Sequence, residues 1–243
     1  NIAQKIKLKI PERKEEEEDT KYTNVEFDNE QIRKLWKGFG DYNDPTGSLF
    51  KFLLLTGQRC GQARKMRWKD VDFKKRTWRI PPTNTKSAEE HSVYLSDMTI
   101  NILENLKNDS QYVFKSPVKD SCITHPGTPA QRIAKRTNVN EFNIHSMRTT
   151  FVTRLSSFGV RQKVVSKIVH HKDSGGGSVI TDIYNKYKYE DERRLAVDKW
   201  DIALRGIINK VNYDSLQKGL KNDVDTSILK RAINKDLNIE SLI

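Results

Sequence analysis

The sequence predicts a mainly α fold with one small antiparallel β-sheet, in the α+β class. Most segments with a regular apolar pattern repeat it at the helical spacing, so that each has one apolar face. Two short runs, 77–80 and 92–95, instead read as strands, and a polar stretch with two prolines separates them. The sequence contains no internal repeat. A helical domain with a single hairpin is therefore expected.

The expected helices follow one another along the chain. Asp28 is a suitable N-terminal cap for the first. The apolar run 46–56 predicts a buried helix that ends near Gly57, and Ser96 is a suitable cap for a later one. The full set of expected helices is 28–39, 46–56, 96–106, 128–136, 146–157, 162–169, 180–187 and 190–208.

Three segments differ in character. Residues 1–24 carry an acidic run without apolar periodicity and are expected to be a linker or arm. Residues 25–210 hold the hairpin and the helices listed above. Residues 211–243 form a helical tail in which apolar residues recur every four positions from Leu216 to Ile228. Such an apolar face needs a surface to cover, either on its own domain or on a neighbouring protomer.

Composition narrows the choice of partner. The 243 residues include 44 Lys and Arg against 32 Asp and Glu, a net charge of +12 that suits a polyanion. Many basic proteins bind no nucleic acid, so charge alone does not decide. Cys60 and Cys122 lie in no CxxC pair, which predicts neither a metal cage nor a disulfide framework and fits the reducing cytoplasm. The longest apolar run, 52–55, is far too short to span a membrane.

A set of residues in this chain suits phosphodiester cleavage without a metal or nucleotide. That reaction needs a nucleophile, cations for the non-bridging oxygens and an acid for the leaving oxygen. Tyrosine can attack phosphorus once it is helped to lose its proton, since its ordinary pKa is about 10. Two guanidiniums match phosphate oxygens, and Lys or His can supply the acid. The candidates are Arg59, Lys86, His145, Arg148, His171 and Tyr184.

Each candidate also has an ordinary interpretation. Arg59 follows a buried helix, where an arginine can stabilise the helix dipole. Lys86 can be a solvated lysine on a hairpin turn, and Tyr184 a half-buried aromatic. The His-x-x-Arg pair at 145–148 lies on one helix face, which is a common surface arrangement. His171 follows an apolar helix and can simply be a residue at its end.

Five stretches resemble the motifs of the tyrosine recombinase family, the phage-integrase class, and occur in that family's order. They are 53–62, 85–96, 144–151, 169–172 and 179–187. The resemblance covers roughly 27–208, and six positions in order are far more specific than any single motif. It implies the tyrosine recombinase (DNA breaking-rejoining) catalytic-domain fold.

The resemblance also implies a role for each candidate. Tyr184 would attack the scissile phosphate, forming a 3′-phosphotyrosyl link and freeing a 5′-hydroxyl. His145 would assist proton transfer, and Lys86 would protonate the leaving oxygen. The residues that would hold the phosphate oxygens are Arg59, Arg148 and His171.

Two positions depart from the family pattern. The family usually has an acid three residues after the first arginine, where this chain has Gln62. An amide can hydrogen-bond a neighbour but cannot form an ion pair with Arg59. The glycine of the family's Leu-Gly-His step is replaced by His170, and the register favours His171 as the second histidine of the site.

Other expectations concern DNA and assembly. Double-stranded DNA is the implied partner, with no cofactor and no metal, and the protein is expected to be a monomer when free and a homotetramer on paired sites. Family members usually carry a helical core-binding domain ahead of the catalytic one, and residues 1–24 are expected to lead out of it. Weaker candidates for DNA contacts, mostly to phosphates, are Arg132, Lys135, Arg136, Thr149, Arg154, Arg161 and Lys172.

The glycines at 175–177 precede the candidate nucleophile. Glycine has little backbone preference, so the helix that carries Tyr184 is expected to be mobile until DNA or a neighbouring protomer places it. In the free domain, Tyr184 is then expected to lie away from the two arginines.

Three other functions compete with a recombinase. A type IB topoisomerase uses the same nucleophile and arginines but rejoins the same strand. A non-catalytic DNA-binding regulator on the same fold is favoured only by Gln62. A metal-dependent nuclease is disfavoured because no carboxylates cluster at suitable spacing. Integration, excision and resolution remain open, with integration favoured.

Overall fold

The computed structural model describes residues 25–42, 45–85, 88–171 and 189–234. The expected linker 1–24 and the expected helix 180–187 lie outside these residues. The helices are α2 (Asn29–Gly40), α3 (Pro45–Thr56), α4 (Cys60–Ala63), α5 (Asp97–Glu104), α6 (Gly127–Thr137), α7 (Ile144–Ser157), α8 (Gln162–Ile168), α10 (Glu190–Ile208), α11 (Tyr213–Lys221) and α12 (Thr226–Asn234). The strands are β1 (Val71–Asp72), β2 (Thr77–Ile80) and β3 (His91–Tyr94), with short 3₁₀ turns at Trp68–Asp70 and Pro82–Asn84.

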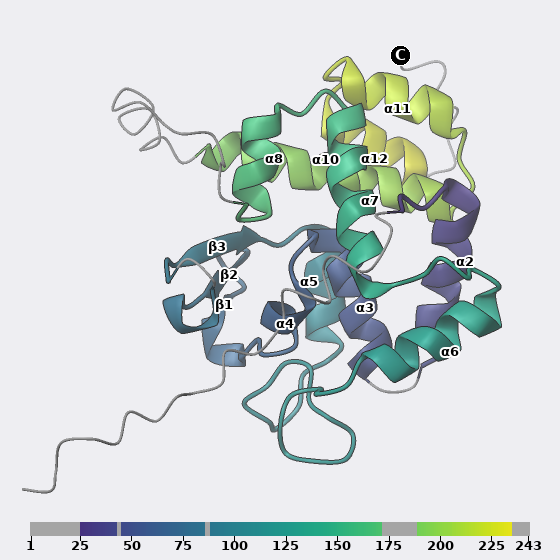
Figure 1. Ribbon diagram of the computed structural model, residues 1–243. Helices are drawn as coiled ribbons and strands as arrows, with labels where there is room; N and C mark the ends of the chain where they lie inside the picture. The colour runs from purple at the N-terminus through teal and green to yellow at the C-terminus, as the bar shows by residue number, and fades with distance from the viewer. Residues whose placement is uncertain (1–24, 43–44, 86–87, 172–188, 235–243) are drawn as a thin grey trace, which may run out of the picture.

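Helix α3 runs through the middle of the fold. Its residues are apolar on nearly every face and almost all of them are buried, as expected of a helix enclosed by others. It packs against α2, α5, α7 and α10, and α6 lies on the far side of α2 (Figure 1). Helix α2 begins with a capping box, in which Asp28 and Gln31 each accept the other's backbone N–H. The predicted cap and buried helix are both confirmed.

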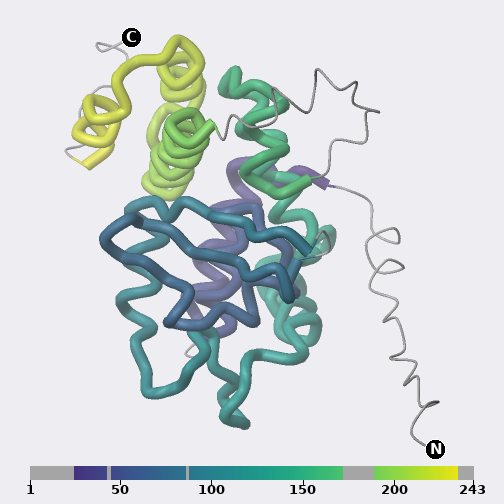
Figure 2. The backbone as a smooth tube through the Cα atoms, turned by 90° about the vertical axis from the view of Figure 1, so that its left-hand side faces the viewer, coloured from purple at the N-terminus to yellow at the C-terminus, as the bar shows by residue number. Residues whose placement is uncertain are grey.

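The sheet has the order β1-β2-β3, with both pairs antiparallel. Figure 2 views it face on, with α10, α11 and α12 above it. Alternation along the strands buries Trp78 and Ile80 of β2 and Val93 of β3, while Arg79 and Ser92 point to solvent. Strand β1, which is only two residues long, was not predicted from the sequence, and β3 begins one residue earlier than predicted. The predicted α+β class is confirmed.

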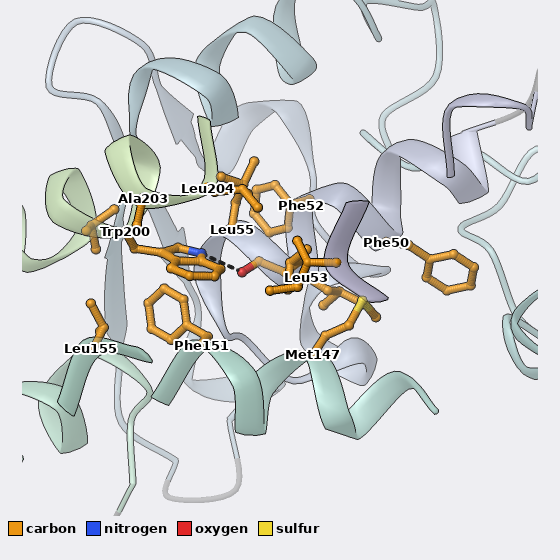
Figure 3. Close-up of a cluster of buried hydrophobic side chains, with 14 of the residues drawn as sticks. Phe50, Phe52, Leu53, Leu55, Met147, Phe151, Leu155, Trp200, Ala203 and Leu204 are labelled. Atoms are coloured by element: carbon orange, nitrogen blue, oxygen red, sulfur yellow. Dashed lines mark hydrogen bonds between the residues drawn. The ribbon is translucent and has the colours of Figure 1, made fainter. Parts of the chain in front are cut away.

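A buried cluster joins α3, α7 and α10 (Figure 3). The Trp200 side chain of α10 is fully buried, and its indole N–H donates to the Leu54 carbonyl oxygen of α3 at 2.9 Å. The Phe151 ring of α7 meets the Trp200 ring edge to face, with centroids 6.3 Å apart. Because the Trp200 side chain contacts both α3 and α7, α10 holds these two helices together.

The described part of the tail folds back on its own domain. Helices α11 and α12 pack on α10, where a Cβ on Gly206 would lie 2.3 Å from a Leu216 methyl. Lys230 of α12 bridges to Asp97 at 3.0 Å and to Asp198 at 3.7 Å. The four-residue pattern belongs to two helices separated by a turn, with Asp223 at φ +56°. In the structure, residues 213–234 therefore pack in cis, on their own domain.

We expect Trp200→Phe to lower the free energy of unfolding by about 2 kcal/mol, because it removes buried volume and the hydrogen bond to Leu54. Urea unfolding followed by circular dichroism measures the change. Trp68→Phe is the matched control, since the buried Trp68 indole N–H has no hydrogen-bond partner among the described residues. It should cost less than about 1 kcal/mol. Equal losses in the two variants would contradict the assigned role of the hydrogen bond.

Candidate active site

The turn after α3 brings Arg59 to the surface. Gly57 has φ +62°, and a Cβ there would lie 2.4 Å from the Phe151 ring of α7, so the close approach of the two helices requires glycine. Two residues later, Arg59 is the N-cap residue of α4 and is half-buried. Its guanidinium makes no hydrogen bond or ion pair with any residue that the structure describes. The fold therefore leaves this guanidinium available to a ligand.

Arg148 lies inside, at the start of α7. The helix is capped by Asn143, whose side chain accepts the Ser146 N–H at 2.9 Å. The Arg148 side chain is 8% exposed and donates to the Gly57 carbonyl oxygen and to the Val169 carbonyl oxygen, both at 2.8 Å. These carbonyls precede Arg59 and His171 by two residues each. Arg148 thus ties together the two segments that carry the other phosphate-binding candidates.

His145 lies one helical turn before Arg148 on α7 and is half-buried. Both residues belong to the first two turns of the helix, and residues three apart on a helix lie on the same side. His171 is exposed just beyond α8, and its backbone N–H donates to the Ser166 carbonyl oxygen at 2.9 Å. The structure therefore brings Arg59, His145, Arg148 and His171 to one region, while Lys86 and Tyr184 lie outside the described residues.

The end of α8 is held by side chains from other elements. The Ile168 carbonyl oxygen accepts the Gln58 amide N–H at 2.9 Å and lies 3.0 Å from His91 Nε2. Because a carbonyl oxygen can only accept, His91 Nε2 must carry a proton. Gln58 is 2% exposed and His91 6% exposed, so both hydrogen bonds are shielded from water.

His170 occupies the position where the family usually has glycine, and its φ is +51°. This left-handed conformation explains the usual glycine and supports the register that makes His171 the second histidine. The His170 ring turns inward and stacks on His91, with centroids 4.5 Å apart and an interplanar angle of 12°. Burial lowers the pKa of His170, and Arg59 and Arg148 lower it further while Glu89 raises it. Both arginines therefore act on the same ring.

Gln62 stands where the family usually has an acid. Its side chain bonds to the β2–β3 hairpin and not to Arg59. It is 6% exposed, and its amide N–H donates to the Asn84 carbonyl oxygen at 3.3 Å, between β2 and β3. Its amide oxygen is buried without a hydrogen-bond partner among the described residues. The amide thus links the helix that follows Arg59 to the turn that precedes Lys86 in the sequence.

The weaker DNA candidates separate into two groups. Arg154 is 12% exposed and serves the fold, because it pairs with Glu26 at 2.8 Å and donates to the Phe27 carbonyl oxygen at 2.9 Å. Arg136 is partly engaged in the same way, donating to the Gly38 carbonyl oxygen at 2.6 Å. Lys172 lies outside the described residues. The remaining candidates are exposed or half-buried and reach the surface: Arg132, Lys135, Thr149 and Arg161. Of these, Arg161 also pairs with Glu192 at 3.3 Å.

The structure was also searched for metal ligands, reactive thiols and helices that could cross a membrane. Within the described ranges, no group of three or more His, Cys, Asp or Glu residues is placed to hold a metal ion. Cys60 and Cys122 are both free thiols, and burial raises the pKa of Cys60 to about 12, so its reactive thiolate is suppressed. A search of the same residues finds no helix with the length and apolar character needed to cross a membrane.

A model of the phage integrase family matches residues 26–190, more than half of the 243 residues. The chain belongs to the phage integrase family. The predicted recognition is confirmed, and the matched span includes the sequence positions of all the candidate catalytic residues. Lys86 and Tyr184 are included in the matched sequence.

Curated proteins with similar sequences are also named integrases. Prophage integrase IntA of Escherichia coli (strain K12) is 29% identical over 159 residues, which are 64% of this chain and 38% of IntA. The chain spans about two fifths of the length of the curated prophage integrases it matches.

Solved structures with the same fold were also found. The Tn1549 transposon integrase in complex with circular intermediate DNA has a TM-score of 0.52 at 14% identity, covering 69% of this chain and 66% of that one. XerH recombinase bound to difH substrate has a TM-score of 0.53 at 17% identity, covering 68% and 54%. Identities this low show the fold alone, and the fold is the one expected.

Two residues of this integrase-family site, Gln58 and His91, were not predicted from the sequence. Gln58 gave no signal, because nothing in an isolated glutamine shows that it will reach another helix. The sequence did carry a signal for His91. Val93 and Leu95 face the core, and the alternation of a strand places His91 on the same side. Starting the strand at position 92 hid that signal.

We expect the stability of the protein to fall as the pH drops below about 6.5, in part because of His91. Desolvation first, and then the neighbouring His170, Arg193 and Arg148, lower the pKa of His91 from 6.5 to about 3. The fold therefore favours the neutral ring, whose contribution is complete above pH 6.5 and is lost as the pH falls toward 3. The loss is at most about 1.4 kcal/mol per pH unit.

Urea unfolding at several pH values between 7 and 4 measures this slope. His91→Phe keeps an aromatic ring but cannot titrate, and Ile168 retains its hydrogen bond from Gln58. The variant should be less stable at pH 7 and show a shallower decline toward pH 4. Parallel slopes for the variant and the unchanged protein would contradict the assignment.

Proposed function

We propose that this chain is the catalytic part of a tyrosine-type site-specific DNA recombinase, with integration as the favoured direction. The observation that carries the proposal is the double hydrogen bond of Arg148 to Gly57 and Val169. It joins the Arg59 turn to the His171 segment, so that residues from three distant stretches meet where a phosphate can bind. Membership of the phage integrase family supports the same chemistry.

The proposed reaction uses the roles that the resemblance to the family implies. Tyr184 attacks the scissile phosphorus, the bond to the 5′ oxygen breaks, and Lys86 gives that oxygen a proton. His145 assists the proton transfer from the tyrosine. The phosphotyrosyl link conserves the phosphodiester, so attack by another 5′-hydroxyl reverses the step without ATP. The groups that neutralise the phosphate oxygens are Arg59, Arg148 and His171.

Double-stranded DNA is the proposed partner. The chain has a net charge of +12, and two of the structural neighbours are themselves complexes with DNA. The exposed basic residues Arg132, Lys135 and Arg161 are proposed to contact phosphates, with Arg136, Thr149 and Lys172 as further candidates. Arg154 is left out because its guanidinium is used within the fold. We propose a monomer in solution and a tetramer on paired sites.

A covalent trapping experiment tests the proposal. Duplexes with randomised sequence around a single nick lose the short strand after cleavage, so the protein stays attached to DNA and is detected after denaturation. We expect an adduct with the unchanged chain and none with Tyr184→Phe. Tyr187→Phe, a tyrosine three residues further on, is the matched control and should form the adduct.

No adduct with the unchanged chain, together with retained DNA binding, would favour a non-catalytic regulator. An adduct that survives Tyr184→Phe would overturn the nucleophile. Exchange of strands between two trapped sites separates a recombinase from a topoisomerase-like enzyme, which rejoins only the original strand.

The two arginines should respond differently to removal. Arg59→Ala should slow single-turnover cleavage about a hundredfold, as the loss of one positioned donor does. It should leave the unfolding free energy nearly unchanged, because the guanidinium has no partner in the described part of the chain. Arg148→Ala should slow cleavage as much and also destabilise the fold, because two buried carbonyl oxygens lose their donor.

Quenched-flow cleavage and urea unfolding, measured on the same preparations, separate the two effects. Arg231→Ala, at an exposed position of α12 that is not among the proposed DNA contacts, is the control and should change neither quantity by much. An Arg59→Ala variant that cleaves at the unchanged rate would remove Arg59 from the site.

A further inference from the structure

The C-terminal end of α8 is a meeting point of three other elements. Ile168 accepts from Gln58, in the turn after α3, and from His91 of β3, while Val169 accepts from Arg148 of α7. The chain then passes through His170 to His171. The position of His171 is therefore set by contacts made one to three residues earlier, not by its own side chain.

His170 is held in a conformation that a residue with a Cβ rarely adopts. At φ +51° its backbone is strained, and glycine would relieve this strain. Its ring stacks nearly parallel on His91 at 4.5 Å, and its Nε2 lies 4.0 Å from a Glu89 carboxylate oxygen. A strained residue at a candidate site is informative when a specific contact accompanies it. Here that contact is the stack on His91.

We propose that His91 and His170 are positioning residues for DNA strand cleavage: their stacked rings fix the end of α8, and with it His171, against β3. The proposal rests on the recombinase function proposed above. Strand β3 follows Lys86 in the sequence, so the pair also relates the segment of the second histidine to the hairpin. Neither ring needs to touch DNA for this role.

The surroundings of the pair are consistent with two neutral rings. The charged groups that act on them are Arg59 from the turn after α3, Arg148 from α7, Arg193 from α10 and Glu89 ahead of β3. Arg193 also donates to the Ser92 carbonyl oxygen, next to His91 in β3. With three guanidiniums and one carboxylate nearby, a proton on either ring would be repelled, and the neutral stack is maintained.

His170→Gly is the decisive variant, because it removes the ring and relieves the positive φ together. A purely structural role predicts equal or greater stability and unchanged cleavage. The positioning role predicts equal or greater stability but a single-turnover cleavage rate at least roughly tenfold lower, with DNA affinity within about twofold. The trapped duplex selected by the unchanged chain serves as substrate, and melting temperature is measured on each variant.

His91→Phe and Ser92→Ala complete the set. His91→Phe keeps a ring for stacking but loses the hydrogen bond to Ile168, and it should slow cleavage less than His91→Ala does. Ser92→Ala changes the adjacent, exposed residue of β3 and should have no effect. The double variant His91→Ala/His170→Gly should be no slower than the slower single variant, because both changes break the same contact.

The outcomes are distinguishable. If the unchanged chain forms no adduct, the proposed function fails and this role fails with it. If the unchanged chain cleaves and His170→Gly cleaves at the same rate, the recombinase stands and the positioning role is overturned. The role is equally overturned if rates fall only in proportion to losses of stability across the set.

Discussion

The arrangement of the candidate site depends on the burial of one cation, the Arg148 guanidinium. Burying a charge is costly unless its N–H groups find acceptors, and the Gly57 and Val169 carbonyl oxygens supply two of them at 2.8 Å. Losing either acceptor would leave a buried donor unsatisfied, at a cost of about 1–3 kcal/mol. The turn after α3, the start of α7 and the end of α8 are therefore fixed relative to one another. The positions of Arg59 and His171 depend on these two hydrogen bonds, because each residue lies two positions after one of the acceptors.

Both segments held by Arg148 contain a residue with positive φ. Gly57 itself supplies one of the two carbonyls, and its missing side chain lets Phe151 approach. His170 follows the other carbonyl directly and has a side chain where glycine would be easier. At Gly57 the residue has only what the positive φ requires. At His170 a side chain is present in addition. The ring of His170 contributes a stack on His91 that glycine would not make.

The fold could be predicted from the sequence largely because its signals are local. Helix α10 and the buried helix α3 were placed within a residue or two from apolar spacing alone. The site was predictable only as an ordered set of motifs, because contacts such as Gln58 to Ile168 join residues 110 positions apart and leave no local pattern. The role of Arg154 within the fold was hidden for the same reason, because its pairing with Glu26 joins residues 128 positions apart in the sequence.

The tail bears on how protomers can assemble. Leu216, Leu229 and Ile233 are buried against their own domain, and each such side chain gains about 2 kcal/mol from leaving water. Moving α11 and α12 to a neighbouring protomer would first expose these residues and break the Lys230 bridges to Asp97 and Asp198. A neighbour would have to offer an equivalent surface before the exchange could occur. On the paired DNA sites proposed above, the local concentration of such a surface would be higher, so an exchange of residues 213–234 between protomers would depend on DNA and not on the free chain.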